Sequence, residues 1–350
     1  MIESGIYFGM GEDEYHAIPA LSNSGVKQIL CSTMNFWAST SWLNPEWEEE
    51  ESKFMDLGKA YHTRIVEGKE TFYSRYAPAL VPDDFPSALR TAEDLRNALP
   101  DGVKKGGNKT ELAARILDHI PDAQIWDLMV EEYQAKHEGK EFLSQNLIKK
   151  IEIAAAMIEK HPVLCKAFSG GYPEVSIVWN CRDTGVPMKA RLDYLKRQAI
   201  VDLKTFSNPF NKPVDRAIAY AVASYKLHIQ VAVYHEAVEE AKRMLNEAEV
   251  AGVKAMQSIL FGEFDPYWIG QFANSEQHEF LFVFQQTGIA PVARGWKFPR
   301  HLTYDIGKIA VAEAKRRFKE KLEKFGKDPW VDEAGIQEFD DHDFPAFLSE

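Results

Sequence analysis

Two aspartates and a lysine lie close together in the run from Arg191 to Thr205, which reads Arg-Leu-Asp-Tyr-Leu-Lys-Arg-Gln-Ala-Ile-Val-Asp-Leu-Lys-Thr. Alternate side chains of a strand share a face, so Asp202 and Lys204 are expected to project from the same side. A turn at 196–198 puts Asp193 within about one residue of the position opposite Asp202, where facing Cβ atoms are roughly 5 Å apart. Two such carboxylates repel each other unless a cation lies between them, and oxygen ligands of this kind suit Mg²⁺ or Mn²⁺. The segment predicts a metal-dependent phosphodiesterase, in which Lys204 orients water or balances phosphate charge.

A simpler interpretation of Asp-x-Lys is a solvated strand edge or an ion pair. The run from Ala199 to Leu203 is almost wholly apolar apart from Asp202, however, which is typical of a core strand. Buried charges are rare without a partner or a metal. The surrounding residues therefore favour the metal site.

The pattern of Asp193 followed by Asp202-Leu-Lys204 resembles the D…(D/E)-x-K core of the PD-(D/E)XK nuclease superfamily. Gly58-Lys-Ala-Tyr-His62 is similar to the Gly-x-x-x-His helix of its RecB-type branch, and the resemblance implies that His62 joins the metal site. By itself, His62 is more simply a hydrogen-bonded core histidine.

Three further matches follow the order of that family, so that the resemblance spans about 12–305. Glu174 matches the acidic residue ahead of the core hairpin, and Gln230-Val-Ala-Val-Tyr234 matches the Gln-x-x-x-Tyr motif of the next helix. The opening from Tyr15 to Ser24 resembles phage and prophage RecE-like exodeoxyribonuclease (exonuclease VIII) domains. Gln230 and Tyr234 are i,i+4 neighbours that could hold one phosphate together, although Tyr234 could equally be a core residue.

The resemblance implies an α/β fold with a central mixed β-sheet flanked by helices and with a helical insertion. It implies that Asp193, Asp202 and the backbone carbonyl of Leu203 hold Mg²⁺ or Mn²⁺, with His62 and Glu174 completing or supporting the shell. RecE-like enzymes degrade linear double-stranded DNA from its ends, 5′ to 3′, in phage-type homologous recombination. The resemblance also implies a ring-shaped homo-oligomer and a single-strand annealing protein as partner.

Two alternatives stay open. One is an endonuclease or single-strand nuclease of the same superfamily. The other is a catalytically silent DNA-binding protein with the same fold, against which the complete set of Asp193, Asp202 and Lys204 speaks.

The chain departs from its relatives at two points. Leu192 stands where the superfamily name has a proline, but the metal needs only the carboxylate that follows. Cys31, Cys165 and Cys181 include no Cys-x-x-Cys pair, which argues against the four-cysteine iron–sulfur cluster of some relatives. The three cysteines are expected to be small core residues in a reducing compartment.

Length and charge limit the possibilities further. A chain of 350 residues can hold one large catalytic domain with insertions or two modest domains. We divide it into 1–90, 91–120 and 121–350. No apolar run approaches about 18 residues and no signal peptide is evident, so we expect a cytoplasmic protein without a membrane segment, in the bacterial host if it is phage-encoded. The net charge of -12 argues against a protein that coats DNA, but permits a positive channel within an acidic exterior.

The segment 91–120 reads as two short helices joined by a basic glycine loop, and it resembles a SAP-type DNA-binding module. Thr110 is expected to cap its second helix. Its basic residues could grip phosphates, and the alternative is a surface hairpin with solvated side chains. They are Lys104, Lys105, Lys109 and Arg115.

Hydrophobic periodicity and turn signals predict the remaining elements. Helices are expected at 54–66, 146–161, 213–222, 224–247 and 304–325, and strands at 174–181, 186–195, 199–205, 278–286 and 290–297. Ser22 and Ser24 are candidate N-caps of an early helix. In the last helix, Lys315, Arg316, Arg317 and Lys319 are expected on a solvated face.

Overall fold

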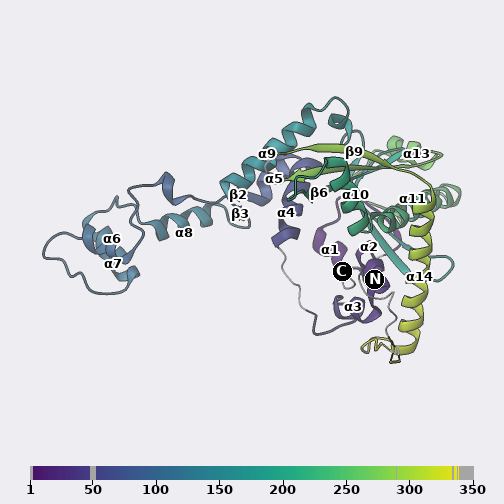
Figure 1. Ribbon diagram of the computed structural model, residues 1–350, viewed down its shortest axis with the longest axis horizontal. Coiled ribbons are helices and arrows are strands. Elements are labelled where there is room, and N and C mark those ends of the chain that lie inside the picture. Colours follow the sequence, from purple (N-terminus) through teal and green to yellow (C-terminus); the bar gives the residue numbers. More distant parts are fainter. Residues whose placement is uncertain (1–2, 48–52, 289, 333–334, 337, 339–350) are drawn as a thin grey trace, which may run out of the picture. The chain divides into compact units, whose positions relative to one another are not determined.

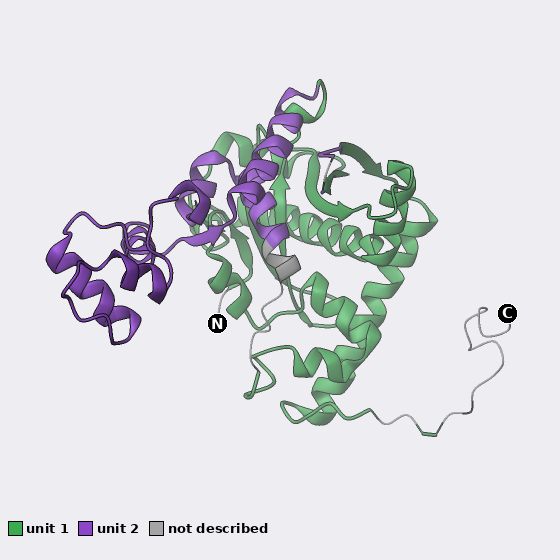
Figure 2. Ribbon diagram, turned by 60° about the vertical axis from the view of Figure 1, so that its left-hand side comes forward, with its two compact units in different colours: residues 1–53, 162–287, 293–350 green, residues 54–161, 288–292 purple. Residues whose placement is uncertain are grey.

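The computed structural model describes residues 3–47, 53–288, 290–332, 335–336 and 338. It divides into two compact units, shown in different colours in Figure 2. The first comprises 1–53, 162–287 and 293–350, and the second comprises 54–161 and 288–292. This division differs from boundaries at 90 and 120, because the His62 helix and the 91–120 segment belong to the same unit.

A mixed seven-stranded sheet forms the centre of the first unit, in the order β7-β1-β4-β5-β6-β8-β9 (Figure 1). The β1–β7 and β6–β8 pairs are parallel and the others are antiparallel. The strands are β1 (Gly5–Tyr7), β4 (Tyr172–Asn180), β5 (Pro187–Leu195), β6 (Ala199–Ser207), β7 (Leu260–Phe261), β8 (Glu279–Thr287) and β9 (Ala293–Phe298).

Helices connect and cover these strands. Between β6 and its parallel neighbour β8 the chain makes a long crossover, as parallel pairing requires. The helices of the first unit are α1 (Glu12–Ala17), α2 (Asn23–Cys31), α3 (Thr33–Ala38), α10 (Val214–Ser224), α11 (Leu227–Ala251), α12 (Val253–Gln257), α13 (Pro266–Ala273) and α14 (Leu302–Phe325), with a 3-10 turn η3 (Leu164–Lys166).

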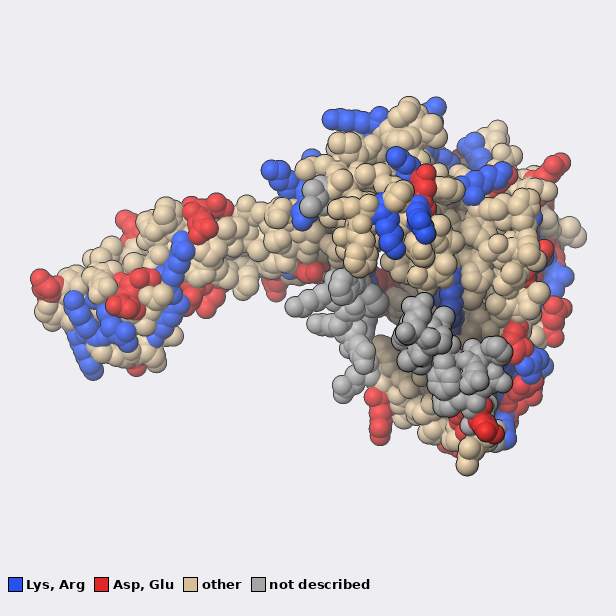
Figure 3. Space-filling view, viewed as in Figure 1, with Lys and Arg blue, Asp and Glu red and all other residues tan. Residues whose placement is uncertain are grey.

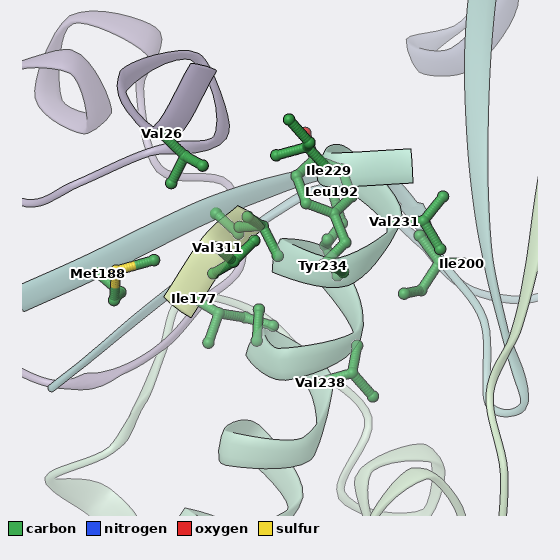
Figure 4. Packing of buried hydrophobic residues seen from close by; sticks show 14 of the residues in the cluster. Val26, Ile177, Met188, Leu192, Ile200, Ile229, Val231, Tyr234, Val238 and Val311 are labelled. Atoms are coloured by element: carbon green, nitrogen blue, oxygen red, sulfur yellow. The ribbon is translucent and has the colours of Figure 1, made fainter. Parts of the chain in front are cut away.

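The core lies between the sheet and α11. Figure 4 shows Ile177, Leu192 and Ile200, from three neighbouring strands, packed beside Tyr234 and Val238 of that helix. Each of these three strand side chains is fully buried. Burying a side chain of this size contributes about 1.5–3 kcal/mol, so this contact holds α11 on the strands that carry the acidic residues.

The helix α14 packs on α11 at a point where no side chain intervenes. A Cβ atom on Gly307 would come within 2.3 Å of the backbone oxygen of His228, so only glycine permits this approach. Further along, Lys315 is buried and its Nζ lies 2.5 Å from an oxygen of Glu236. The prediction that Lys315 belongs to a solvated face is therefore wrong, because the packing of α14 turns it inward.

The second unit consists of short helices and two paired strands. Its elements are α4 (Lys53–His62), a π-helical turn η1 (Thr63–Glu67), α5 (Lys69–Arg75), β2 (Tyr76–Pro78), a 3-10 turn η2 (Pro82–Asp84), α6 (Ala92–Ala98), α7 (Lys109–His119), α8 (Trp126–Lys136), β3 (Glu141–Leu143) and α9 (Gln145–Lys160). A buried guanidinium links them: Arg64 bonds to Glu152 and Glu159 of α9.

The α6–α7 hairpin has its own small core, formed by Leu95, Leu112 and Ile116 with their neighbours. The prediction that Thr110 caps the second helix is wrong. Asn108 is the cap, since its side chain accepts the backbone N–H of Glu111 and the Glu111 carboxylate returns the bond. This reciprocal capping box moves the helix start two residues earlier than the sequence suggested.

Most predicted elements are present, with shifted ends. The helix expected at 54–66 ends at His62 and continues as a π-turn, and Ser22 caps α2 by accepting from the Gly25 N–H. Cys181 is buried as expected, but Cys31 and Cys165 are exposed, so the prediction that all three are core residues is wrong. No helix in the described ranges is long and apolar enough to cross a membrane.

Two buried histidines make the first unit sensitive to acid. Burial, together with the charge of Arg300, lowers the pKa of His235 to about 4. Burial and the nearby Lys242 ammonium lower the pKa of His278 to about 3. The ordinary value is about 6.5, so between these limits the unfolded chain binds more protons than the folded one. The free energy of unfolding must therefore fall as the pH is lowered from about 6.5 toward 4.

We expect His278→Asn to reduce the pH dependence of the free energy of unfolding by up to about 1.4 kcal/mol per pH unit. The reason is that the variant no longer takes up a proton at this position on unfolding. Urea unfolding at a series of pH values measures the slope. The matched control is His301→Asn at an exposed position, which should leave the slope as it is. Equal slopes in wild type and His278→Asn would contradict the assignment.

Candidate metal centre

Three acidic residues occupy one row across neighbouring strands of the sheet. The β4–β5 register places Glu174 opposite Asp193. The β5–β6 register pairs Tyr194 with Val201 and continues to place Asp193 opposite Asp202. The prediction that the two aspartates face each other across a hairpin is thus confirmed. Carboxylate oxygens of Glu174 and Asp193 lie within 4.8 Å of each other.

Asp193 also bonds to the backbone of the neighbouring strand. Its Oδ2 accepts the N–H of Leu203 at 2.9 Å. Backbone pairing between β5 and β6 involves Tyr194 and Leu195. Next to these pairs, the Asp193 side chain satisfies the backbone N–H of Leu203. This bond fixes the Asp193 carboxylate beside the Asp-Leu-Lys segment. The role of the Leu203 carbonyl as a metal ligand stays a prediction.

Asp202 is fully buried, on a strand with neighbours on both sides. Lys204 Nζ lies 2.5 Å from its Oδ1, and the Gln230 side-chain amide donates to its Oδ2 at 2.5 Å. The prediction that Asp202 and Lys204 project from the same face of a strand is confirmed by this ion pair. Both carboxylate oxygens have a partner, which is the condition for keeping a charge in the interior.

The electrostatics of the site favour the protonated forms of Lys204 and Tyr234. Burial acts to lower the pKa of Lys204, but the carboxylates of Asp202 and Asp193 outweigh it and raise the pKa above its ordinary value. Burial and the same two carboxylates raise the pKa of Tyr234 well above its ordinary value. Lys204 is therefore a cation at neutral pH, and Tyr234 is a neutral phenol that can donate a hydrogen bond.

Glu174 has a strained backbone, with a φ of 53° inside a strand. A non-glycine residue in this left-handed region costs about 1–3 kcal/mol, and such residues cluster at functional sites. The carboxylate is bonded to the Arg191 guanidinium, which also donates to the backbone oxygen of Met10 at 3.0 Å. Arg191 thus ties β4 and β5 to the loop before α1.

Lys27 on α2 belongs to the surroundings of the site, although the sequence analysis did not single it out. Its Nζ donates to the backbone oxygen of Tyr225 at 2.7 Å. Burial and the charge of Lys204 lower the pKa of Lys27 to about 8, against the opposite pull of Asp202. No spacing in the sequence relates α2 to β6, so this proximity is visible only in the folded chain.

His62 lies in the second unit, as the last residue of α4. Its Nδ1 is 3.9 Å from Glu67, which in turn pairs with both terminal nitrogens of Arg75. The π-turn that begins immediately after His62 is of a kind often found at functional sites. The metal role of His62 stays a prediction.

The predicted DNA-binding residues of the α6–α7 hairpin differ in what they contact. Lys109 pairs with Asp127 at 2.7 Å, and Arg115 donates to the backbone oxygens of Lys104 and Gly106. Arg115 therefore holds the glycine loop in place. Lys104 and Lys105 are exposed, and Figure 3 shows basic side chains gathered on this hairpin among acidic ones. Their binding to DNA stays a prediction.

The donor set of the first unit fits a divalent cation of the Mg²⁺ or Mn²⁺ type. Glu174, Asp193 and Asp202 provide only carboxylate oxygens, which are the ligands such ions prefer. Lys204 pairs with Asp202 and Arg191 with Glu174, and Lys27 adds a third positive charge nearby. A bound divalent cation would add charge directly between the carboxylate oxygens, where their mutual repulsion is largest.

A family model described as "PDDEXK-like domain of unknown function (DUF3799)" matches residues 22–253 of this chain. That range includes Lys27, the three acidic residues, Lys204 and Gln230. No curated protein matches the chain by sequence. Among solved structures, the chain resembles one described as a "Putative exonuclease" from Eubacterium rectale, at 14% identity, covering 88% of this chain and 86% of that chain, with a TM-score of 0.44. A likeness this distant carries no argument here.

Metal binding should stabilise the protein through the aspartates. At a free Mn²⁺ concentration of about 100 times the dissociation constant, the free energy of unfolding should rise by about 2.7 kcal/mol. We expect Asp193→Asn and Asp202→Asn to lose most of this gain, because each removes a charged ligand. Thermal unfolding with and without Mn²⁺ measures it, with exposed Asp215→Asn as the control. An unchanged gain in both variants would place the metal elsewhere.

Proposed function

Because this chain belongs to the family of PDDEXK-like domains, we propose that it is a metal-dependent exodeoxyribonuclease acting on linear double-stranded DNA. The family is part of the PD-(D/E)XK nuclease superfamily, and the chain has the α/β fold of that superfamily. The observation that carries the proposal is the row of Glu174, Asp193 and Asp202 with Lys204 at 2.5 Å from Asp202. Acidic ligands and an adjacent cation are the groups that phosphodiester hydrolysis requires.

In this proposal Asp193 and Asp202 hold Mg²⁺ or Mn²⁺ together with the backbone carbonyl of Leu203, and Glu174 supports the shell. The bound ion would supply Lewis-acid polarisation of the phosphate and a more acidic bound water. Lys204, kept protonated by the two aspartates, orients the attacking water and offsets the charge that develops on the phosphate.

Gln230 and Tyr234 divide their roles. The amide of Gln230 is already donated to Asp202, so we assign it to positioning that carboxylate. Tyr234 keeps its proton and can donate a hydrogen bond to a phosphate oxygen near the metal. The pair thus contributes to positioning more than to charge.

The direction of cleavage and the partners rest on the resemblance to RecE-like domains. We propose degradation from DNA ends in the 5′ to 3′ direction, a role in phage-type recombination in the cytoplasm of a bacterial host, a homo-oligomer and a single-strand annealing partner. The alternative of an endonuclease or single-strand nuclease needs no change in the residues of the site, because the metal chemistry is the same.

Cleavage should depend on the ion pair. We expect Lys204→Met to slow Mg²⁺-dependent cleavage of a linear duplex by about 10²–10³-fold, as loss of one charge-stabilising group does elsewhere, and Asp202→Asn to slow it at least as much. The matched control is Lys297→Met, which removes an exposed lysine of β9. Full activity of both site variants, with folding verified by circular dichroism, would refute the site.

The same assay separates the candidate activities. With a 5′-labelled linear duplex, a 5′ to 3′ exonuclease releases the label early, and with a 3′-labelled duplex it releases the label late. Rapid nicking of covalently closed circles would favour the endonuclease, and no cleavage of any substrate would favour the silent DNA-binding protein.

The role proposed for His62 is tested through metal affinity. We expect His62→Ala to raise the Mn²⁺ concentration for half-maximal cleavage by at least about tenfold while DNA affinity changes little, because an imidazole in the shell contacts the cation and not the phosphate. An unchanged midpoint would return His62 to a structural role within its own unit.

The α6–α7 hairpin is tested by salt dependence. We propose that Lys104 and Lys105 contact DNA phosphates. Replacing both with Gln should lower the slope of log affinity against log salt by roughly 1.8, since each lost contact contributes about 0.9. The control is Lys136→Gln on α8, where the lysine is paired with Glu132. An unaltered slope would mean that the hairpin does not bind DNA.

A further inference from the structure

Three aromatic rings are exposed along α10 and the loop before it. Phe210 is 80% exposed, Tyr220 is 49% exposed and Tyr225 is 46% exposed. Their neighbours on the inner side of α10, Ala217 and Ile218, are buried in the core. The rings therefore do not anchor the helix, and their apolar surface faces solvent.

Basic side chains lie between these rings. Lys212 Nζ is 5.8 Å from the ring centroid of Phe210 and 4.3 Å from that of Tyr220, and the Arg216 guanidinium is 6.0 Å from the Tyr220 ring. The two Lys212 distances together limit the separation of the rings to about 10 Å. That spacing accommodates up to about two bases stacked between the rings at roughly 3.4 Å per step.

The local charge is opposite to that of the whole chain. Residues 205–235 contain one acidic residue, Asp215, against the basic residues Lys212, Arg216 and Lys226, in a chain whose net charge is -12. Figure 3, in the same view as Figure 1, shows basic and uncharged side chains over the place where Figure 1 labels α10. The segment that follows β6 is thus locally positive.

This surface leads directly to the candidate metal centre. The surface begins just after β6, which ends at Ser207, three residues beyond Lys204. The surface ends at Tyr225, whose backbone oxygen accepts a hydrogen bond from Lys27. The charges of Lys204 and Asp202 both act on the pKa of Lys27. The helix α10 between them has 11 residues and is therefore about 16 Å long, enough for about five stacked nucleotides.

We propose that α10 and the preceding loop bind an unpaired DNA strand next to the metal centre, with Phe210 and Tyr220 stacking on bases and Lys212 and Arg216 contacting phosphates. This inference deepens the proposed nuclease function and rests on it. Stacking on exposed rings combined with basic side chains is how proteins bind single strands without reading sequence. A duplex offers its bases only at a frayed or resected end, so the surface would guide one strand into or away from the site.

A second copy of the chain is the other occupant that an exposed aromatic surface could have. The centre of a protein interface is depleted in lysine, whereas here Lys212 lies between two of the rings. The positive charge among the rings therefore favours a nucleic acid over a second copy of this chain as the occupant.

The test uses the full chain in EDTA, so that no cleavage occurs, and measures fluorescence anisotropy with a labelled 12-nucleotide oligothymidylate. We expect Phe210→Ala with Tyr220→Ala to weaken binding by about tenfold or more, because each stacked base contributes measurably, and Tyr220→Phe to bind like wild type. The matched control is Tyr267→Ala, an aromatic residue on α13 that is 70% exposed.

Equal affinity of the double variant and the Tyr267→Ala control would overturn the proposal. A change of oligomeric state in sedimentation without a change in single-strand affinity would also overturn it, and would assign the rings to a contact between copies. Failure of the nuclease function itself is seen separately, as absence of cleavage by wild type with Mg²⁺ or Mn²⁺, and does not affect the anisotropy measurement.

Discussion

The buried charge of Asp202 is the constraint on which the rest of this structure depends. Moving a carboxylate into a protein interior costs several kcal/mol even after relaxation, and removing the partner of a buried pair costs about 3–5 kcal/mol. Here Lys204 and Gln230 complete its interactions from β6 and α11. The apolar contact between α11 and the sheet is what holds Gln230 at this position, so core packing and site geometry are one arrangement.

The sheet departs from regular pairing where the acidic residues meet. Glu174 takes a left-handed backbone, and Asp193 accepts a backbone N–H of β6 with its side chain. Both departures occur in the row where the carboxylates of Glu174, Asp193 and Asp202 meet. Repulsion between these negative charges opposes this arrangement. Strain and like charge in one place are typical of a site that a cation completes, and they would be a cost without benefit in a purely structural strand.

The chain as a whole is acidic, but its charge is not uniform. The segment after the β5–β6 hairpin is basic and exposes aromatic rings. In contrast, α14 pairs many of its basic side chains with acidic ones on the same helix. Under the proposed function, such a distribution would keep DNA from most of the surface and attract it near the candidate metal centre. The net charge of the whole chain does not reveal this local difference.

The sequence by itself determined the hairpin, the facing aspartates and the shared face of Asp202 and Lys204, because strand alternation and a short turn are local rules that depend on few neighbours. The resemblance to the Gln-x-x-x-Tyr motif indicated Gln230 and Tyr234, and helical spacing placed them one turn apart. Only the tertiary structure decided that Gln230 donates to Asp202, that Lys27 lies near Lys204, and that Lys315 is buried, since these contacts join segments far apart in the chain. The capping of α7 by Asn108 was missed for a different reason. Asn108 and Thr110, two residues apart, are both of a type that caps helices, and the reciprocal bond with Glu111 selects Asn108.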